Sequence, residues 1–153
     1  MCDPTPMTES ELRWLADQLA LRDLIARVAQ LADTGEVDEY AACWAEDGEW
    51  VAPTDSLGVS AGDPPRRGRD SVIAGVRHRR AMGVQGPGTH TRHVVSTTSL
   101  TRTGPDSATG RSYWRYYADT DALPRIVLTG QYDDEFVRSP DGWRLRVRRV
   151  SRT

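Results

Sequence analysis

Two residues in this sequence have side chains that could move protons inside an enclosed site. His93 lies in the run 89–96, which has the alternation of a strand and places His93 on one face with Thr91 and Val95. An imidazole titrates near neutral pH and can act as a general acid or base. Asp33 lies in the last turn of a predicted helix, where the helix dipole disfavours a carboxylate. The presence of Asp33 at this position therefore indicates a role other than stabilising the helix.

If the fold brings these two residues together, they would form a carboxylate–imidazole pair. Asp33 would fix the tautomer and orientation of the His93 ring and raise its basicity. The free ring nitrogen could then take a proton from water or from a carbon next to a carbonyl group, which typically contributes ~10²–10⁴-fold in rate. Ala26 and Ala29 stack beneath Asp33 on the same helix face and leave space beside it. The alternative is that Asp33 is an exposed residue in a helix-ending turn.

The composition is that of one ordinary domain. The 153 residues carry a net charge of −2, which supplies no basic field to hold nucleic acid. No apolar run approaches the roughly 18 residues that cross a bilayer, and no charged-then-apolar leader is present, so we expect a cytoplasmic protein with no membrane partner. All 20 basic residues are Arg, which excludes Schiff-base chemistry through a lysine. The two Cys and three His do not cluster at ligand spacing, so we expect no metal site. The sequence has no glycine-rich phosphate loop, so we also expect no cofactor.

The elements that would position this pair are three helices followed by strands. Thr8 and Glu11 form a capping box for the first helix, which should end at Thr34 with Gly35 in the left-handed conformation. A short helix should follow, with Val37, Tyr40, Ala41 and Trp44 on one face. This order predicts an α+β fold. The remaining predicted elements are a strand at 49–52, a helix at 69–82 and strands at 89–102, 107–118, 125–138 and 143–151.

Three connecting stretches complete the prediction. Residues 1–7 hold two prolines and no periodic pattern, so they should be flexible. Residues 53–68 are rich in Pro, Gly, Ser and Asp, and form the longest predicted loop, a candidate lid over a pocket mouth. Residues 83–88 are expected to form a flexible link into the strand that carries His93.

Four stretches of the chain, in a fixed order, match a known family: "LRDLIARVAQLADTGEVDEYAACWAEDGEW" (21–50), "GRDSVIAG" (68–75), "TRHVVS" (91–96) and "GQYDDEFVRSPDGWRLRVRR" (130–149). On these stretches the chain resembles SnoaL-like proteins, a branch of the nuclear transport factor two-like superfamily. The resemblance implies a single domain over residues 1–153 and a cone-shaped α+β barrel. In such a barrel a curved antiparallel sheet wraps around three N-terminal helices and leaves a deep pocket at the wide end.

The dehydratase-like branch of this superfamily, which includes scytalone and bile-acid dehydratases, pairs an Asp at the end of the first long helix with a His on the strand after the third helix. The Asp of "LAD" is Asp33 and the His of "TRH" is His93, so the pair is matched residue by residue. Where dehydratases carry a Tyr about one turn before the Asp, this chain has Val28 and Ala29. Scytalone-type dehydratases carry a second His on the next strand, near the place that Ser112 occupies here. The usual leaving-group donors are therefore not kept.

Strand parity supplies candidates for holding a substrate. In the strand 107–118, Ser112, Trp114 and Tyr116 share one face because side chains alternate along a strand. The resemblance implies that this face is the pocket side. Aromatic side chains there and on neighbouring strands suit a planar or polycyclic substrate. Alternatively the aromatic residues only pack in the core, and the Arg near the end of the last strand points out to water. The candidates for substrate binding are Trp50, Ser112, Trp114, Tyr116, Tyr132 and Arg149.

The leading hypothesis is a cofactor-independent enzyme of the lyase or isomerase type that acts on a small, hydrophobic, polycyclic metabolite. The reaction would be dehydration, isomerisation or cyclisation, with His93 as base or acid and Asp33 as its orienting partner. One alternative is a non-catalytic ligand-binding protein, such as a homologue of the dioxygenase small subunit. Another is an epoxide-hydrolase-like enzyme that uses a carboxylate-activated water. The resemblance also implies a homodimer formed through the outer sheet face, where Tyr113 and Tyr117 would suit an interface.

Overall fold

Helices precede strands along the chain, and the α+β architecture is confirmed. A computed structural model of the protein describes residues 6–52 and 65–152. Most of the candidate lid, residues 53–64, lies outside the described residues, as do residues 1–5 of the predicted flexible end. The elements are α1 (Glu9–Thr34), α2 (Val37–Ala42), β1 (Trp44–Val51), β2 (Arg66–Arg67), α3 (Arg69–Ala81), β3 (Arg92–Gly104), β4 (Ser107–Ala118), β5 (Arg125–Ser139) and β6 (Gly142–Arg152).

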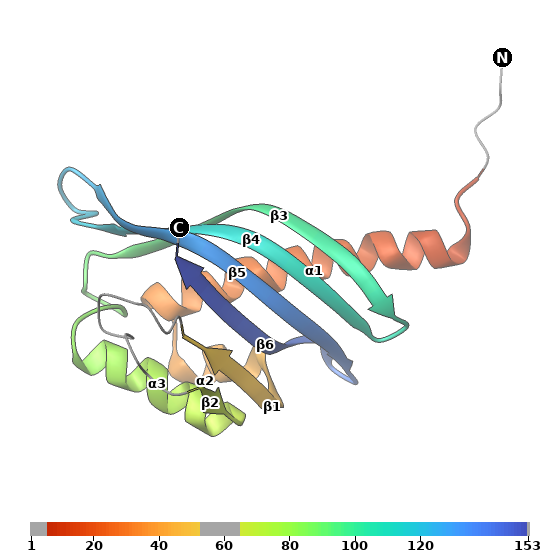
Figure 1. The fold of residues 1–153 in the computed structure, drawn as a ribbon, viewed down its shortest axis with the longest axis horizontal. Coiled ribbons are helices and arrows are strands. Elements are labelled where there is room, and N and C mark those ends of the chain that lie inside the picture. The colour runs from red at the N-terminus through yellow and green to blue at the C-terminus, as the bar shows by residue number, and fades with distance from the viewer. Residues whose placement is uncertain (1–5, 53–64, 153) are drawn as a thin grey trace, which may run out of the picture.

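The strands form one curved sheet in the order β2-β1-β6-β5-β4-β3 (Figure 1). Strands β3 to β6 are consecutive antiparallel neighbours, as the long meander predicts. The sheet is mixed rather than wholly antiparallel, because β1 pairs with β6 in parallel and β2 adds to the outer side of β1. Helix α1 packs against β3 and β6, while α3 packs against β1 and β2. None of the described helices is both long and apolar enough to cross a membrane.

The core lies between the helices and the concave face of the sheet. Leu21 of α1, Phe136 of β5 and Leu145 of β6 are almost completely buried there. Trp44 is also fully buried, but it belongs to β1 and not to the second helix as predicted. It pairs with Leu145 across the parallel β1–β6 junction, and the Leu145 N–H donates to the Cys43 carbonyl over 2.9 Å. Pairing with the C-terminal strand thus overrides the helical spacing that included Trp44.

Helix α1 carries the capping box that the sequence predicts. The Thr8 N–H donates to Glu11 Oε2 over 2.7 Å, and the Glu11 N–H donates to Thr8 Oγ1 over 3.3 Å. At the other end the prediction for Gly35 is wrong, because its φ of −92° is not left-handed. A Cβ at Gly35 would instead lie 2.3 Å from Leu31 Cδ2, so close packing requires the glycine.

A cation from α3 completes the C-terminal end of α1. Arg80 Nη2 donates to the carbonyl oxygens of Leu31 and Gly35 over 2.8 and 2.7 Å. The Leu31 carbonyl also accepts the Gly35 N–H over 3.1 Å, so the guanidinium adds a second donor at the end of the helix. A positive charge at this end complements the helix dipole. The last turn of α1, which carries Asp33, is therefore held against α3.

Candidate active site

Asp33 and His93 meet at the junction between the end of α1 and the beginning of β3. Asp33 Oδ1 lies 2.6 Å from His93 Nδ1, and Asp33 Oδ2 accepts the backbone N–H of His93 over 2.7 Å. The Asp33 side chain is 1% exposed and that of His93 is 18% exposed. A carboxylate accepts hydrogen bonds only, so Nδ1 carries the proton and Nε2 is the nitrogen available for proton transfer.

The fold explains why the His93 backbone is free to bind a carboxylate. Strand β3 lies at the edge of the sheet. Within residues 6–52 and 65–152 it pairs only with β4, so one side of its backbone has no neighbouring strand there. The His93 N–H on that side donates to Asp33 instead. The carboxylate is therefore fixed by a main-chain donor as well as by the ring, and the ring is fixed with it. This arrangement orients the imidazole before any substrate binds.

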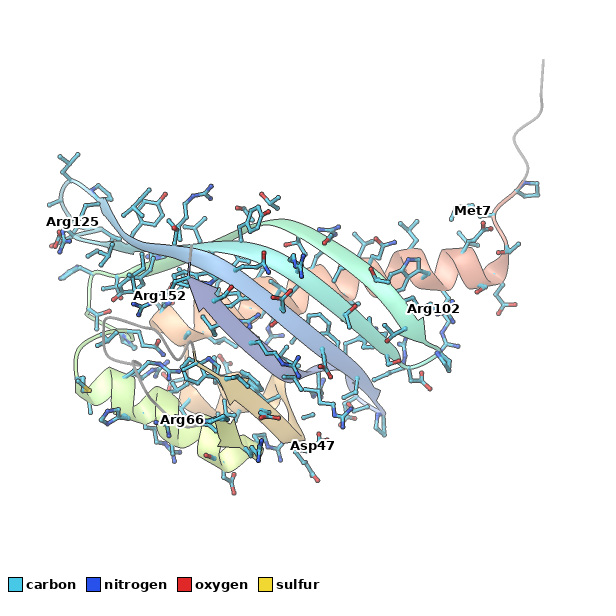
Figure 2. All side chains as sticks on the ribbon, viewed as in Figure 1. Met7, Asp47, Arg66, Arg102, Arg125 and Arg152 are labelled. Atoms are coloured by element: carbon cyan, nitrogen blue, oxygen red, sulfur yellow. The ribbon has the colours of Figure 1, made fainter. Side chains whose placement is uncertain are left out.

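His93 forms part of the wall of a cavity of ≈ 390 Å³. This volume falls in the range of about 300–1,000 Å³ that is common for small-molecule sites. The cavity lies toward the end of the sheet where the β4–β5 hairpin projects, marked by Arg125 in Figure 2, and away from Arg102. Its lining residues are Val28, Ala29, Ala32, Tyr40, Trp50, Arg79, Val84, Gln85, His93, Trp114, Tyr116, Val127, Leu128, Tyr132, Arg148, Val150 and Arg152.

Four of the aromatic residues selected from the sequence line this cavity. The rings of Trp114 and Tyr132 are stacked, with centroids 5.7 Å apart and an angle of 23° between their planes. The ring of Tyr116 packs beside that of His93 at 5.0 Å. Trp50 lies beneath the guanidinium group of Arg79, whose Cζ is 4.9 Å from the ring centroid. These flat walls fit a planar hydrophobic molecule.

Both tyrosine hydroxyls in the cavity wall, those of Tyr116 and Tyr132, stay protonated near neutral pH because their pKa values are raised. Burial raises the pKa of Tyr132 to about 12. Burial also raises the pKa of Tyr116, and the nearby Asp33 carboxylate adds to this effect. The Tyr116 hydroxyl donates its single proton to the carbonyl oxygen of Val84. Tyr116 therefore supports the wall and can accept a hydrogen bond from a substrate, but it has no second proton to donate.

Two of the selected residues do not reach the cavity. Ser112 is buried farther along β4, where its Oγ lies 3.1 Å from Thr98 Oγ1, and it does not line the cavity. Arg149 faces the opposite side of the sheet and its Nη1 lies 2.7 Å from Glu135 Oε1. Its side chain is 53% exposed. The structure therefore places Ser112 and Arg149 outside this cavity, which argues against their selection as substrate-binding residues.

The cause of the error at Arg149 is a register shift between β5 and β6. Phe136 pairs with Leu145, but the preceding residue of β5, Glu135, pairs with Val147. Strand β6 therefore holds one extra residue, Arg146, at this point. Such a bulge reverses which side chains face inward beyond it. Arg148 therefore lines the cavity in place of Arg149.

Arg148 is a cavity residue that sequence reasoning missed. Its Nε and Nη2 bind the two oxygens of Asp134 over 2.8 and 2.7 Å, and both side chains are almost fully buried. Its Cζ also lies 4.0 Å from the ring centroid of Tyr132. Burial alone would lower the pKa of Arg148, but the Asp134 carboxylate outweighs that effect and raises it. A signal was available in the sequence: β5 carries two neighbouring acidic residues, Asp133 and Asp134, and β6 carries two neighbouring basic residues, Arg148 and Arg149. The acidic pair faces the basic pair across the hairpin.

The model of the SnoaL-like domain matches residues 13–149, and the chain belongs to this family. Comparison with the curated proteins finds no match.

Several solved structures share the fold. An NTF2-like protein with a cystatin-like fold from Novosphingobium aromaticivorans is 27% identical, with a TM-score of 0.74 over 94% of this chain and 86% of the other. ActVI-ORFA from Streptomyces coelicolor is 25% identical, with a TM-score of 0.68 over 88% and 96% of the two chains. A protein named as a candidate scytalone dehydratase, also from N. aromaticivorans, is 22% identical, with a TM-score of 0.70 over 91% and 85%. The chain is thus similar to cystatin-like NTF2 proteins along almost its whole length.

Proposed function

We propose that this protein is a cofactor-independent enzyme that transfers a proton on a small, hydrophobic, polycyclic metabolite. The observation that carries the proposal is the Asp33–His93 pair, joined over 2.6 Å, with its imidazole in the wall of a cavity of ≈ 390 Å³. A buried carboxylate stabilises the imidazolium that forms when the ring takes up a proton. The largely aromatic and aliphatic lining excludes water and favours an apolar substrate.

The proposed chemistry begins with removal of a proton from a carbon next to a carbonyl group. The C–H electron pair becomes the C=C bond of an enolate, the carbonyl oxygen takes the negative charge, and His93 Nε2 holds the proton. Where a further C=C bond of the substrate is conjugated with the enolate, return of that proton to the far end of this system gives isomerisation. Its return to a departing hydroxyl group releases water and gives dehydration. Because Val28 and Ala29 line the cavity and carry no acidic proton, His93 would serve as both base and acid.

If the protein were a non-catalytic binding protein, side chains should fill the pocket or Asp33 and His93 should lie far apart. The open cavity and the short contact between the two side chains both favour the enzyme. The epoxide-hydrolase-like alternative needs further polar groups to hold a water beside the carboxylate. Both Asp33 oxygens are already engaged by His93, which favours a role in orienting the ring over one in activating water.

A panel of hydroxylated polycyclic ketones tests this proposal. The wild-type protein should convert at least one member, followed by the change in absorbance as conjugation changes. The His93→Ala variant should lose about 10²–10⁴-fold in kcat, because the general base is removed. His90→Ala is the matched control, since His90 is exposed and paired with Asp121. Near-normal turnover by a folded His93→Ala variant would contradict the proposal.

A further inference from the structure

Two N–H donors lie buried in residues of the cavity wall without an acceptor in the part of the chain that the structure describes. They are Nε2 of Gln85 and Nε1 of Trp114. The two residues are only 4% and 5% exposed. Buried donors are nearly always hydrogen-bonded in folded proteins, so a pair of orphaned donors beside one cavity points to a missing acceptor.

We propose that Gln85, assisted by Trp114, binds the carbonyl oxygen of the substrate and stabilises the negative charge that this oxygen develops. This inference deepens the proposed function and rests on it. It assigns to the substrate a hydrogen-bond acceptor, a ketone or quinone oxygen. It also supplies an oxyanion donor, which the Tyr116 hydroxyl cannot be because its proton is donated to Val84.

The orientation of the Gln85 amide follows from its neighbour. Arg79 Nε donates to Gln85 Oε1 over 3.2 Å. An arginine side chain has donors only, so the amide oxygen must face Arg79 and the amide nitrogen must point elsewhere. The positive charge also polarises the amide, which makes Nε2–H a stronger donor. Arg79 is itself held over the ring of Trp50.

The segment that carries Gln85 is anchored on both sides. The preceding carbonyl, of Val84, accepts the hydroxyl proton of Tyr116. The following carbonyl, of Gly86, accepts the Thr89 hydroxyl over 2.8 Å. Gly86 has a φ of +110°, a conformation that a side chain would oppose. These contacts give the predicted flexible link a defined path, and they fix the donor before the substrate arrives, which is what electrostatic stabilisation requires.

The same cavity wall thus provides a base and an oxyanion donor. When His93 removes the proton from the carbon next to the carbonyl, His93 becomes an imidazolium and the negative charge of the enolate lies mainly on the carbonyl oxygen. Hydrogen bonds from Gln85 and Trp114 strengthen as that charge develops, so they favour the enolate over the ketone. Gln85 then contacts the substrate directly and is a catalytic residue in the strict sense.

Binding of 1-tetralone and tetralin, measured by isothermal titration calorimetry, tests this inference. The two probes differ chiefly in one carbonyl oxygen. The wild-type protein should bind 1-tetralone roughly 3- to 10-fold more tightly than tetralin, the range expected for a hydrogen bond. The Gln85→Glu variant keeps an oxygen for Arg79 but replaces the N–H donor with a second acceptor, so the preference should fall to about one or reverse.

The control is Gln30→Glu, the same chemical change at an exposed position of α1, and it should keep the wild-type preference. Gln85→Leu is a second variant that removes both polar atoms, and circular dichroism establishes that each variant is folded. An unchanged preference in folded Gln85→Glu, a wild type without preference, or a wild type that binds neither probe would overturn the inference. Because binding needs no proton transfer, the result is independent of the His93→Ala turnover result, and either proposal can fail alone.

Discussion

At the scale of single residues, Asp33 is the partner that decides what His93 can do. Its two oxygens accept the ring N–H and the main-chain N–H of the same residue. Because both oxygens bind His93, the carboxylate cannot rotate toward another partner without breaking both of these hydrogen bonds. In the neutral ring the proton therefore lies on Nδ1, and Nε2, which faces away from Asp33, has the lone pair that can accept a proton.

Replacing Asp33 by Asn should reverse the tautomer of His93. The amide can present its N–H₂ group to Nδ1, which would move the ring proton to Nε2 and remove the base from the cavity side. We expect kcat to fall about 10²–10⁴-fold. Long-range ¹H–¹⁵N NMR spectra should show His93 protonated at Nδ1 in the wild type and at Nε2 in the variant. The same tautomer in both proteins would contradict this role.

At the scale of elements, the sequence predicts the helices well because their signals are local. The Thr8–Glu11 capping box places the start of α1. The pairing of Asp33 with His93, by contrast, is predicted only through the resemblance to SnoaL-like proteins, because nothing local in the sequence shows that the two residues meet. The β6 bulge has no local signature, so strict alternation selects Arg149 where the fold uses Arg148. Gln85 lies in a short segment with glycines on either side, and only the hydrogen bonds from β4 and from Thr89 reveal that it is held in place.

The β5–β6 hairpin is tied to α1 by Asp17, which gives a second prediction. Asp17 Oδ1 accepts from Arg138 Nη2 over 2.5 Å and from Trp143 Nε1 over 3.1 Å. Burial alone would raise the pKa of Asp17, but these hydrogen bonds and the Arg138 charge outweigh it, and the pKa lies below its ordinary value of 3.8. A lowered pKa contributes stability above the ordinary value, and this contribution is lost as the pH falls through the folded-state value.

Asp17→Asn should therefore destabilise the protein by roughly 1–3 kcal/mol at pH 7, since it removes a charged acceptor from a largely buried site. Urea unfolding of the wild type and the variant at several pH values measures the difference. This difference should be constant above about pH 5 and should shrink as the pH falls below 3.8. A difference that stays constant down to the acid limit would show that the carboxylate charge is not responsible. Asp47→Asn, at an exposed ion pair with Arg146, is the control.

At the scale of the whole molecule, the outer face of the sheet is the surface we propose for a homodimer. Val94, Tyr113 and Ile126 are 40%, 48% and 53% exposed, on the adjacent strands β3, β4 and β5. Apolar and aromatic groups gathered on one face are typical of interfaces between subunits.

Light scattering after size-exclusion chromatography tests the dimer. The wild type should have about twice the 17.0 kDa mass of one chain. Tyr113→Glu should shift the protein toward the monomer, because it places a charge within the proposed interface. Leu19→Glu introduces the same charge at a residue that is 65% exposed on α1, and it should leave the mass unchanged. A wild-type monomer, or equal effects of the two substitutions, would contradict the proposed interface.

The most direct test of the account needs no knowledge of the natural substrate. Deuterium incorporation at C2 of 1-tetralone, followed by NMR in D₂O near neutral pH, reports proton removal from a carbon next to a carbonyl group. We predict that the wild type accelerates this exchange over buffer, that His90→Ala does so equally, and that His93→Ala returns the rate to that of buffer. Exchange at the wild-type rate in folded His93→Ala, or no acceleration by a wild type that binds the ketone, would contradict a proton-transfer role for His93.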